Sequence, residues 1–435
     1  MRHRSAGVGA LVVLAIVRSV LAEEPRMTCA DRWQIKVTCD AGSAVLTVDP
    51  PDWVSVADER YETLALFQGP VWRRGTPLLG TKAEACSVAD ALAPSSLVVR
   101  DRPGAGAKTY TLGKDYQLEP RWGGFGRLEG GTIAAGQPVF ASYRYALMRL
   151  DSAVLTADKK IVLRRGVPHV ATPRPPDLAA GETRVGNIWL SGRIDGLTAA
   201  NCFPVLEAAY PASQRVGPTA AERLLSKTLA KLQAGQPVRI LAWGDSVTEC
   251  VYLPFQQKWQ EQFAARLRER FPKASIVMLS EGWGGRTTTA YRSEPPGSPR
   301  NYAEKVLALK PDLIVSEFIN DASMDEAAVL GNYGAILKDF KKIGAEWIIL
   351  TPHYARPDWM GLKQETGCDQ DPRPYVRELR LFAENNRVAL ADVSLRWGRL
   401  WRQGVPYSTL LLNNINHPDE RGMKIFADAL MDVFP

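Results

Sequence analysis

Residues 238–246 read Val-Arg-Ile-Leu-Ala-Trp-Gly-Asp-Ser, and this stretch decides the fold. Its apolar run ends at Trp243 and has the length and composition of a strand that is buried on both faces. Such strands are typical of parallel sheets, whose reactive groups lie at the carboxyl ends of the strands. The turn that follows therefore places Ser246 at the mouth of a parallel strand, where a serine hydroxyl can act as a nucleophile.

The chain downstream of this stretch alternates strand and helix patterns. Further apolar runs predict strands at residues 276–279, 313–315, 347–350 and 388–390. Large apolar residues recur every four positions from Trp259 to Phe271, which indicates one helix, and residues 327–343 and 375–385 have similar patterns. Pro418 with Asp419 and Glu420 indicates the start of another helix. Repeated strand–helix units predict a parallel sheet covered by helices on both faces, a three-layer α/β/α domain.

The first half of the chain has a different pattern. From about residue 26 to about residue 211, short β-type runs are separated by Gly and Pro, and no long helical pattern competes. We expect strands at residues 34–39, 44–48, 97–99, 110–112, 139–145, 160–163 and 187–190. This composition predicts an N-terminal all-β domain, either a sandwich or a pair of small β modules.

The length of 435 residues favours two domains. Residues 1–22 have a basic start, an apolar middle and a small-residue end, which predicts a signal peptide and an exported protein, periplasmic or extracellular. Arg18 interrupts the apolar run and argues against a membrane anchor. We therefore expect a β-rich accessory domain over residues 23–215, an α/β domain over residues 216–435, and no stable membrane insertion once the signal is removed.

Charge and cysteine content exclude some classes of protein. Removal of residues 1–22 takes away three arginines and no acid, which lowers the formal charge from +7 to +4. So small a surplus, without blocks of Lys or Arg, does not favour nucleic acid as a partner. None of the six cysteines forms a Cys-x-x-Cys pair, so a zinc ribbon is not expected. Our guesses for disulfides are Cys29–Cys39 and Cys250–Cys368.

A serine nucleophile needs a base, and only four histidines are present: His3, His169, His353 and His417. His3 lies in the predicted signal and His169 in the β half. We favour His417 as the base and expect His353 to line the pocket, although either could be a structural histidine in a loop. Ser246 could likewise serve only as a helix cap.

Two further residues can donate hydrogen bonds to an oxyanion, which an acyl-transfer reaction requires. Gly285 follows the second strand and offers its backbone N–H, and Asn320 follows the third strand and offers its side-chain amide. Each has a simpler explanation, an ordinary turn for Gly285 and a helix cap for Asn320. Their order between Ser246 and His417 favours the catalytic interpretation.

These residues resemble the SGNH (GDSL-type) hydrolases, whose sequence blocks are Gly-Asp-Ser, an isolated glycine, an asparagine and a late histidine. Residues 238–250, 276–289, 312–321 and 412–426 carry the resemblance. It implies a flavodoxin-like three-layer α/β/α domain that hydrolyses esters. By the resemblance, Ser246 is the nucleophile, His417 is the base, and the N–H of Ser246, the N–H of Gly285 and the Asn320 side chain form the oxyanion hole.

One position departs from the family pattern. The family usually has an aspartate three residues before the histidine, where this chain has Asn414. An asparagine can orient an imidazole but cannot neutralise its positive charge. Charge support could come from Asp419, Asp392, Glu249 or a backbone carbonyl, or the enzyme could use a Ser–His dyad. An inactive protein is the remaining alternative.

The resemblance, the predicted export and the β domain favour an acylated carbohydrate as substrate, which would make the protein a carbohydrate acetylesterase, with no cofactor and no metal. Another small ester, a lipid ester or a thioester is the alternative substrate, and a non-catalytic glycan-binding envelope protein is the alternative class. The scarcity of histidines and of clustered acids argues against a metal-dependent phosphatase. Tryptophans of the β half could stack on sugars or lie in its core: Trp72, Trp122 and Trp189. Others could narrow the acyl pocket: Trp243, Trp283 and Trp359.

Overall fold

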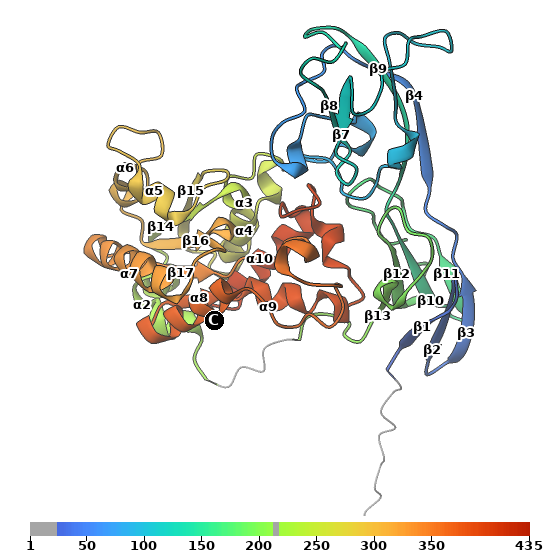
Figure 1. Ribbon diagram of the computed structural model, residues 1–435. Helices are drawn as coiled ribbons and strands as arrows, with labels where there is room; N and C mark the ends of the chain where they lie inside the picture. Colours follow the sequence, from blue (N-terminus) through green and yellow to red (C-terminus); the bar gives the residue numbers. More distant parts are fainter. Residues whose placement is uncertain (1–23, 212–216) are drawn as a thin grey trace, which may run out of the picture.

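The computed structural model describes residues 24–211 and 217–435. A β-rich half precedes a half built on a parallel sheet (Figure 1). The predicted signal peptide lies outside the described residues, and so does the predicted boundary at residue 215. Among the described residues, no helix is long and apolar enough to cross a membrane.

The β-rich half contains two modules, one inserted into the other. The lower module of Figure 1 pairs a three-stranded sheet with a four-stranded sheet of order β11-β10-β12-β13. Its strands are β1 (Arg26–Asp31), β2 (Gln34–Cys39), β3 (Gly42–Thr47), β10 (Arg149–Leu155), β11 (Ile161–Arg164), β12 (Thr183–Leu190) and β13 (Cys202–Pro204). Alternate residues of β2 pack against β12 in one apolar core, which includes Ile35, Val37 and Ile188. The two sheets therefore cover each other, as the period-two pattern of residues 34–39 predicts.

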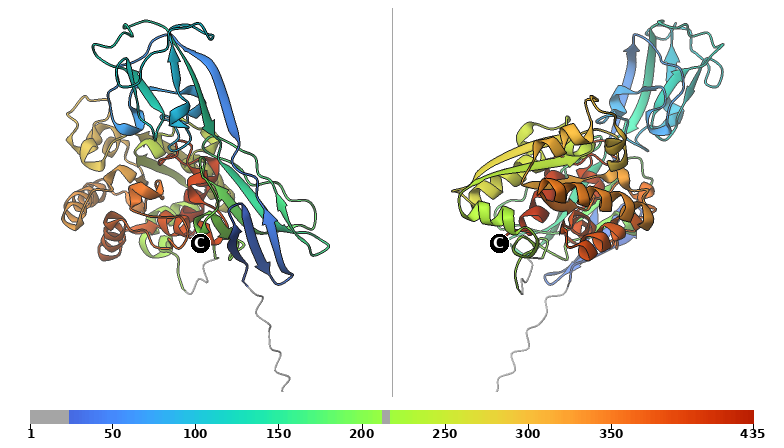
Figure 2. Two further views of the ribbon diagram at one scale, coloured as in Figure 1. Left: turned by 45° about the vertical axis from the view of Figure 1, so that its right-hand side comes forward. Right: turned by 90° about the vertical axis from the view of Figure 1, so that its left-hand side faces the viewer.

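The upper module occupies the chain between β3 and β10, and it extends past the other half of the molecule (Figure 2). It has two three-stranded sheets, of orders β4-β9-β6 and β5-β8-β7. The strands are β4 (Trp53–Tyr61), β5 (Thr76–Pro77), β6 (Val98–Arg100), β7 (Tyr116–Leu118), β8 (Gly124–Arg127) and β9 (Val139–Ala146). The alternative of two small β modules is thus the one observed.

The strand expected at residues 110–112 is wrong. Tyr110 is buried in the core of the upper module, but only isolated bridges form around it, at Thr109 and Leu112. The Asp115 carboxylate accepts a hydrogen bond from the N–H of Thr111 at 2.8 Å and holds this segment in a turn. Local side-chain bonding of this kind competes with strand pairing.

The second half is built on a five-stranded sheet of order β15-β14-β16-β17-β18. Every neighbouring pair is parallel. The strands are β14 (Pro237–Gly244), β15 (Ser275–Gly282), β16 (Leu313–Glu317), β17 (Glu346–Leu350) and β18 (Ala389–Ala391). Because β14 lies between β15 and β16, the strand order reverses there. A crevice at the carboxyl ends of β14 and β16 is the expected place for a site.

Helices cover both faces of this sheet and make it a three-layer α/β/α domain. Consecutive residues of β14 point to opposite faces: Ile240 and Ala242 join one core, and Leu241 and Trp243 join the other. The helices on the first face include α2 (Ser226–Gln233), α4 (Trp259–Arg270), α9 (Val393–Gly398) and α10 (Glu420–Met431). Those on the second face include α5 (Thr288–Ser293), α6 (Tyr302–Lys305), α7 (Glu326–Ile343) and α8 (Pro374–Asn386). The short α1 (Ala220–Leu224) precedes the sheet.

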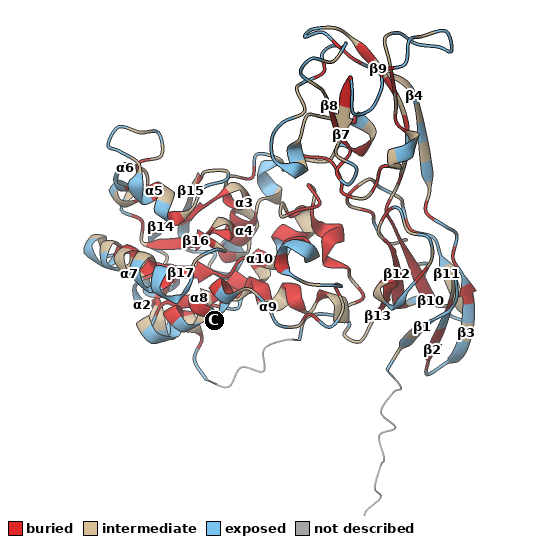
Figure 3. Cartoon of the chain, in the orientation of Figure 1, coloured by how far each residue is buried: buried red, intermediate tan, exposed pale blue. Residues whose placement is uncertain are grey.

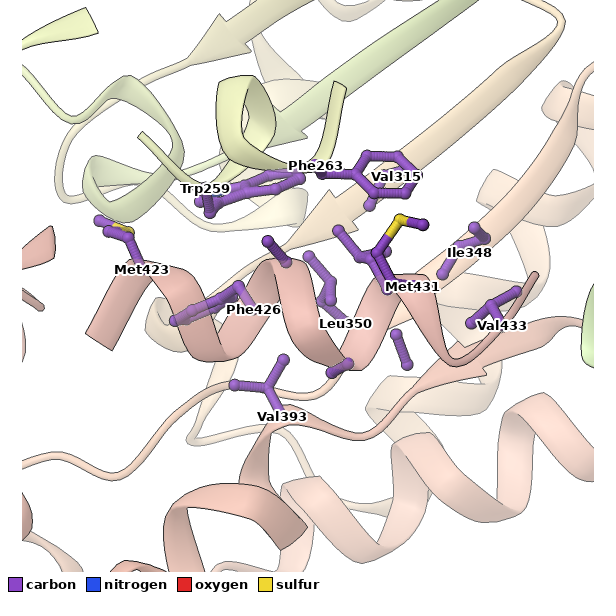
Figure 4. Packing of buried hydrophobic residues seen from close by; sticks show 14 of the residues in the cluster. Trp259, Phe263, Val315, Ile348, Leu350, Val393, Met423, Phe426, Met431 and Val433 are labelled. Carbon is purple, nitrogen blue, oxygen red and sulfur yellow. The ribbon is translucent and has the colours of Figure 1, made fainter. Parts of the chain in front are cut away.

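The core on the first face shows why the sequence folds this way. Trp259 and Phe263 of α4 share one apolar core with the sheet residues Val315 and Ile348 and with Phe426 of α10 (Figure 4). The predicted helix face from Trp259 is therefore correct. Exposed residues are concentrated on the outer faces of helices such as α7 (Figure 3). Helix α10 begins two residues later than Pro418 suggests, because Asp419 is its N-cap and accepts from the N–H groups of Arg421 and Gly422.

Both β modules contact the sheet-bearing half. In the lower module, the Asn187 amide donates to the carbonyl of Gly404 at 2.6 Å, and Glu207 pairs with Arg399. From the upper module, Arg121 pairs with Asp358 at 2.8 Å. The two halves are thus joined by specific polar contacts as well as by the chain between them.

Candidate active site

Ser246 lies where the sequence predicts, in the turn between β14 and the short helix α3 (Ser246–Glu249). Asp245 is the N-cap of this helix, and its carboxylate accepts from the N–H of Val247 at 3.1 Å. Asp245 itself is fully buried, whereas Ser246 is partly exposed. The turn therefore holds the Ser246 hydroxyl at the surface of the crevice while its neighbour anchors the backbone.

His417 reaches Ser246 from the loop before α10. The side-chain oxygen of Asn413 accepts three backbone N–H groups, those of Ile415, Asn416 and His417, at 2.8–2.9 Å. This fixes the loop so that Nε2 of His417 lies 3.0 Å from Oγ of Ser246. The ring of Tyr252 stacks on the imidazole with centroids 4.6 Å apart and planes 6° apart, which prevents the ring from tilting.

The other imidazole nitrogen contacts a residue that the sequence analysis missed. Nδ1 of His417 hydrogen-bonds the carboxylate of Glu84, which belongs to the upper β module. The two side chains are 14 % and 25 % exposed, so the pair is largely shielded from water. With Nδ1–H donating to Glu84, Nε2 is the free acceptor for the Ser246 hydroxyl. Ser246, His417 and Glu84 thus form a continuous hydrogen-bonded chain across the two halves.

A tight turn presents Glu84 to the histidine. Around it, the N–H of Ala83 donates to the carbonyl of Cys86 at 2.8 Å, and the N–H of Cys86 donates to the carbonyl of Glu84 at 2.8 Å. Ala85 has φ of +59°, a left-handed conformation that costs a non-glycine residue about 1 kcal/mol. The thiol of Cys86 donates to the carbonyl of Asn413 at 3.0 Å, so the turn is fixed to the loop that carries the histidine. Burial raises the pKa of this thiol to about 12, which keeps it a donor.

Asn414 does not take the part of the missing aspartate. It has φ of +55°, and its side-chain oxygen accepts from Arg356 at 3.3 Å. The acids that the sequence analysis considered have other partners. Asp419 caps α10 and pairs with Arg421, Asp392 pairs with Arg380, and Glu249 accepts from the N–H of Gly284 and pairs with Arg300. Those expectations are wrong, because the carboxylate comes from a part of the chain that they did not include.

Asn320 and the turn that contains Gly285 lie next to the segment Asp245–Ser246. The Asn320 amide donates one N–H to the Asp245 carboxylate at 2.8 Å, which orients the amide and leaves its second N–H for another acceptor. Gly285 has φ of +72°, which suits glycine. Its neighbour Gly284 comes so close that an added Cβ would lie 3.7 Å from the Cβ of Ser246. The N–H of Gly284 is used by Glu249, whereas the N–H groups of Gly285 and Ser246 have no acceptor within the described chain.

A second carboxyl lies behind Asp245. Glu317, the last residue of β16, is fully buried, and no N–H or hydroxyl of the described residues donates to its oxygens. Burial and the neighbouring Asp245 raise the pKa of Glu317 well above its usual value. Burial also raises the pKa of Asp245 to about 6. Glu317 is therefore held as the neutral acid beside the Asp245 carboxylate.

Other predicted pocket residues lie elsewhere. His353 is fully buried, not in the pocket, and its Nε2–H donates to the carbonyl of Asn416 at 2.8 Å, so it supports the His417 loop from behind. Burial lowers the pKa of His353 to about 3, and the ring stays neutral. Trp243 is also fully buried and packs against Phe318 in the sheet core, so it cannot narrow an acyl pocket. Trp283 is partly exposed and lies under the guanidinium of Arg286 at 4.2 Å.

The disulfide guesses are not supported. All six cysteines, the predicted pairs included, have free thiols. The thiol of Cys29 lies against Cys202, and not against Cys39, because β1 and β13 are adjacent. Within residues 24–211 and 217–435, no three His, Cys, Asp or Glu side chains are grouped to hold a metal ion.

Two of the solved structures that are similar to part of this chain are esterases. An acetylxylan esterase, Axe2, from Geobacillus stearothermophilus is 20 % identical, with a TM-score of 0.37, over 45 % of this chain and 94 % of that chain. A two-domain esterase, CEX, described as active on acetylated mannans and co-crystallised with mannopentaose, is 16 % identical, with a TM-score of 0.40, over 49 % of this chain and 53 % of that chain. Likeness at this level does not identify a substrate.

The remaining comparisons concern sequence. Among curated proteins, none matches this chain significantly. A family model described as the GDSL-like Lipase/Acylhydrolase family matches residues 242–425. The match begins in β14, before Ser246, and ends in α10, after His417, so it contains both residues of the 3.0 Å contact. Residues 242–425 therefore form a GDSL-like lipase/acylhydrolase domain of the SGNH type.

Proposed function

We propose that this protein is an exported serine esterase that removes small acyl groups, acetyl foremost, from a carbohydrate. Ser246 is the nucleophile and His417 is the general base. Glu84 is the carboxylate that orients the imidazole of His417 and stabilises its protonated form. The observation that carries the proposal is the continuous contact from Ser246 through His417 to Glu84.

The reaction follows from this geometry. The Ser246 hydroxyl attacks the ester carbonyl while Nε2 of His417 takes its proton. The carbonyl oxygen becomes an oxyanion, which accepts from the N–H groups of Ser246 and Gly285 and from the free N–H of Asn320. The imidazolium then protonates the leaving sugar oxygen and an acyl-enzyme remains. Water activated by His417 attacks the acyl-enzyme, releases the acid and restores the serine.

Glu84 acts through the histidine. Its carboxylate holds the proton on Nδ1, so that Nε2 is basic toward Ser246, and it offsets the charge that the imidazole gains during attack. Asp245 has a matching function for the oxyanion hole, since it aims the Asn320 amide. Both functions need the donor and the acceptor to be fixed before substrate binds, and both pairs are shielded from bulk water.

Glu84 also bears on the alternative class of protein. The suggestion of a non-catalytic binding protein depended on the absence of an acid at Asn414. A carboxylate on Nδ1 of His417 removes that reason and favours an enzyme. Export is inferred from residues 1–22, whose predicted removal would leave Glu23 as the first residue.

The test is hydrolysis of p-nitrophenyl acetate, butyrate and octanoate by the wild type, Ser246→Ala and His417→Ala. We expect turnover to be fastest with acetate and to fall by at least about 10³-fold in both variants. Preference for octanoate would indicate a lipid esterase. Turnover that does not depend on Ser246 would exclude the proposed nucleophile. His169→Ala is the matched control for His417→Ala, because His169 is exposed in the β half and its ring hydrogen-bonds its own loop.

A further inference from the structure

A pocket in the upper β module lies beside the turn that carries Glu84. It has a volume of about 420 Å³, within the roughly 300–1,000 Å³ of small-ligand sites. Its lining includes Trp72, Arg73, Arg74, Lys82, Cys86 and Trp122, and we call it the Trp72 pocket.

The charged side chains that line the Trp72 pocket are all positive. Arg73, Arg74 and Lys82 line it, and no Asp or Glu does. Arg73 lies over the Trp72 ring, and the Arg74 guanidinium donates to the carbonyl of Gly69 at 3.0 Å. In the described part of the chain, none of the three cations has a carboxylate partner. Three cations without a counter-ion at one concave site favour an anionic ligand.

The pocket also has an aromatic wall. Trp122 is almost fully buried and packs with Cys86 and Ile415, while Trp72 is partly exposed against the same cluster. Trp122 is further held by the guanidinium of Arg356, 4.7 Å from its ring centroid. Trp122 thus supports the pocket from behind, and the partly exposed Trp72 is the indole that can contact a sugar ring, while the guanidinium groups can bind a carboxylate through paired N–H donors.

The same turn joins the pocket to the catalytic residues. Lys82, Ala85 and Cys86 line the pocket, and Glu84 between them contacts His417. Consecutive Cα atoms are about 3.8 Å apart, so the backbone of Glu84 directly adjoins that of Ala85 in the pocket wall. A ligand in the pocket would therefore contact the turn whose Glu84 hydrogen-bonds His417, the partner of Ser246.

From these observations we infer that the Trp72 pocket is a subsite for a carboxylated sugar, a uronic acid unit of the acylated polysaccharide on which the esterase acts. The inference rests on the proposed function for its catalytic consequence, but the binding itself does not need an active Ser246. The anionic sugar would hold the polysaccharide beside Ser246, so that the acyl groups removed are those near a uronate.

Binding is measured first, by calorimetry with the full chain carrying Ser246→Ala. The probes are oligogalacturonate and, as a neutral comparison, mannopentaose. We expect the uronate to bind more tightly by roughly tenfold or more, with affinity falling as salt rises, because charge-assisted hydrogen bonds carry the difference. Equal affinity for both oligosaccharides, or no binding of the uronate, would overturn the inference.

The variant that tests the pocket is Arg73→Gln/Arg74→Gln/Lys82→Gln. We expect it to lose uronate binding by roughly tenfold or more, and to lose a similar factor in kcat/KM on an acetylated polyuronide. Its turnover of p-nitrophenyl acetate should stay within about twofold of wild type, which also shows that it folds. The matched control, Lys36→Gln/Lys227→Gln/Lys338→Gln, removes the same charge from exposed positions outside the pocket. An equal loss of binding in the control would refute a local subsite.

The readouts separate the two proposals. If p-nitrophenyl acetate hydrolysis does not depend on Ser246, the proposed esterase fails, but the binding comparison still decides whether the pocket takes a uronate. If hydrolysis depends on Ser246 and the pocket variant binds the uronate as well as the wild type does, only the subsite is refuted.

Discussion

Replacing Glu84 by Gln should remove most of the catalytic rate without unfolding the protein. Two unit charges 4 Å apart attract by about 4 kcal/mol at an effective dielectric constant of about 20, and by about 1 kcal/mol in water. The 14 % and 25 % exposure of the two side chains places the pair nearer the first value. Since about 1.4 kcal/mol corresponds to tenfold in rate, we expect kcat to fall by roughly 10²- to 10³-fold.

The assay is steady-state hydrolysis of p-nitrophenyl acetate, with KM expected to change little because Glu84 does not contact the substrate in the proposed mechanism. Glu62→Gln is the matched control, since Glu62 lies in an exposed ion pair of the same module. A Glu84→Gln variant that keeps kcat within about threefold of wild type would refute the argument and leave a Ser–His dyad.

A second variant separates position from charge. Asn414→Asp restores an acid at the position usual for the family, in a Glu84→Gln background. We expect no recovery of kcat, because the Asn414 side chain faces Arg356 and its backbone has φ of +55°. Recovery to near the wild-type rate would mean that the loop can present an acid to His417 without the β module.

Three other substitutions test the remaining parts of the site. Asn320→Ala should lower kcat by about 10²- to 10³-fold with a small change in KM, as loss of one oxyanion donor does; an unchanged kcat would exclude this role. For Glu317→Gln, we compare the melting temperature of the variant with that of the wild type at two pH values. The variant's advantage should be larger at pH 8 than at pH 5. The folded wild type keeps a proton on the Glu317–Asp245 pair that the unfolded chain releases above about pH 4. The free energy of unfolding of the wild type therefore falls as pH rises, by up to about 1.4 kcal/mol per pH unit. A difference in melting temperature that does not change with pH would contradict this. Cys86→Ala should lower the free energy of unfolding by about 1–2 kcal/mol, measured by denaturant titration, because it removes the buried donor to the Asn413 carbonyl; no loss would mean that this contact does not hold the turn.

Much of the second half could be predicted from local pattern. A strand buried on both faces must be continuously apolar, so residues 238–243 and the later apolar runs predicted the sheet. Parallel strands bring their carboxyl ends to one edge, and therefore Ser246 and Asn320 could be expected to meet there. Trp243 was misjudged because proximity in sequence to the site does not tell on which face of the strand a side chain lies.

Glu84 could not be predicted in this way. It lies 333 residues before His417 in the chain, in a β module whose sequence has no recognised motif. Its position depends on how two halves dock, and docking depends on shape and on scattered polar contacts that have no period. The one sequence signal was negative, the lack of an acid at Asn414, which indicates that a carboxylate must come from elsewhere.

The insertion of the upper β module has a consequence for how activity arises during synthesis. A ribosome completes this module long before it reaches His417, so Glu84 is made among the first residues of the site and its partner among the last. Neither half alone contains the full hydrogen-bonded chain from serine to carboxylate. Esterase turnover thus indicates that the two halves have docked. A chain whose halves fold but do not dock would lack the carboxylate contact to His417 and would have little activity.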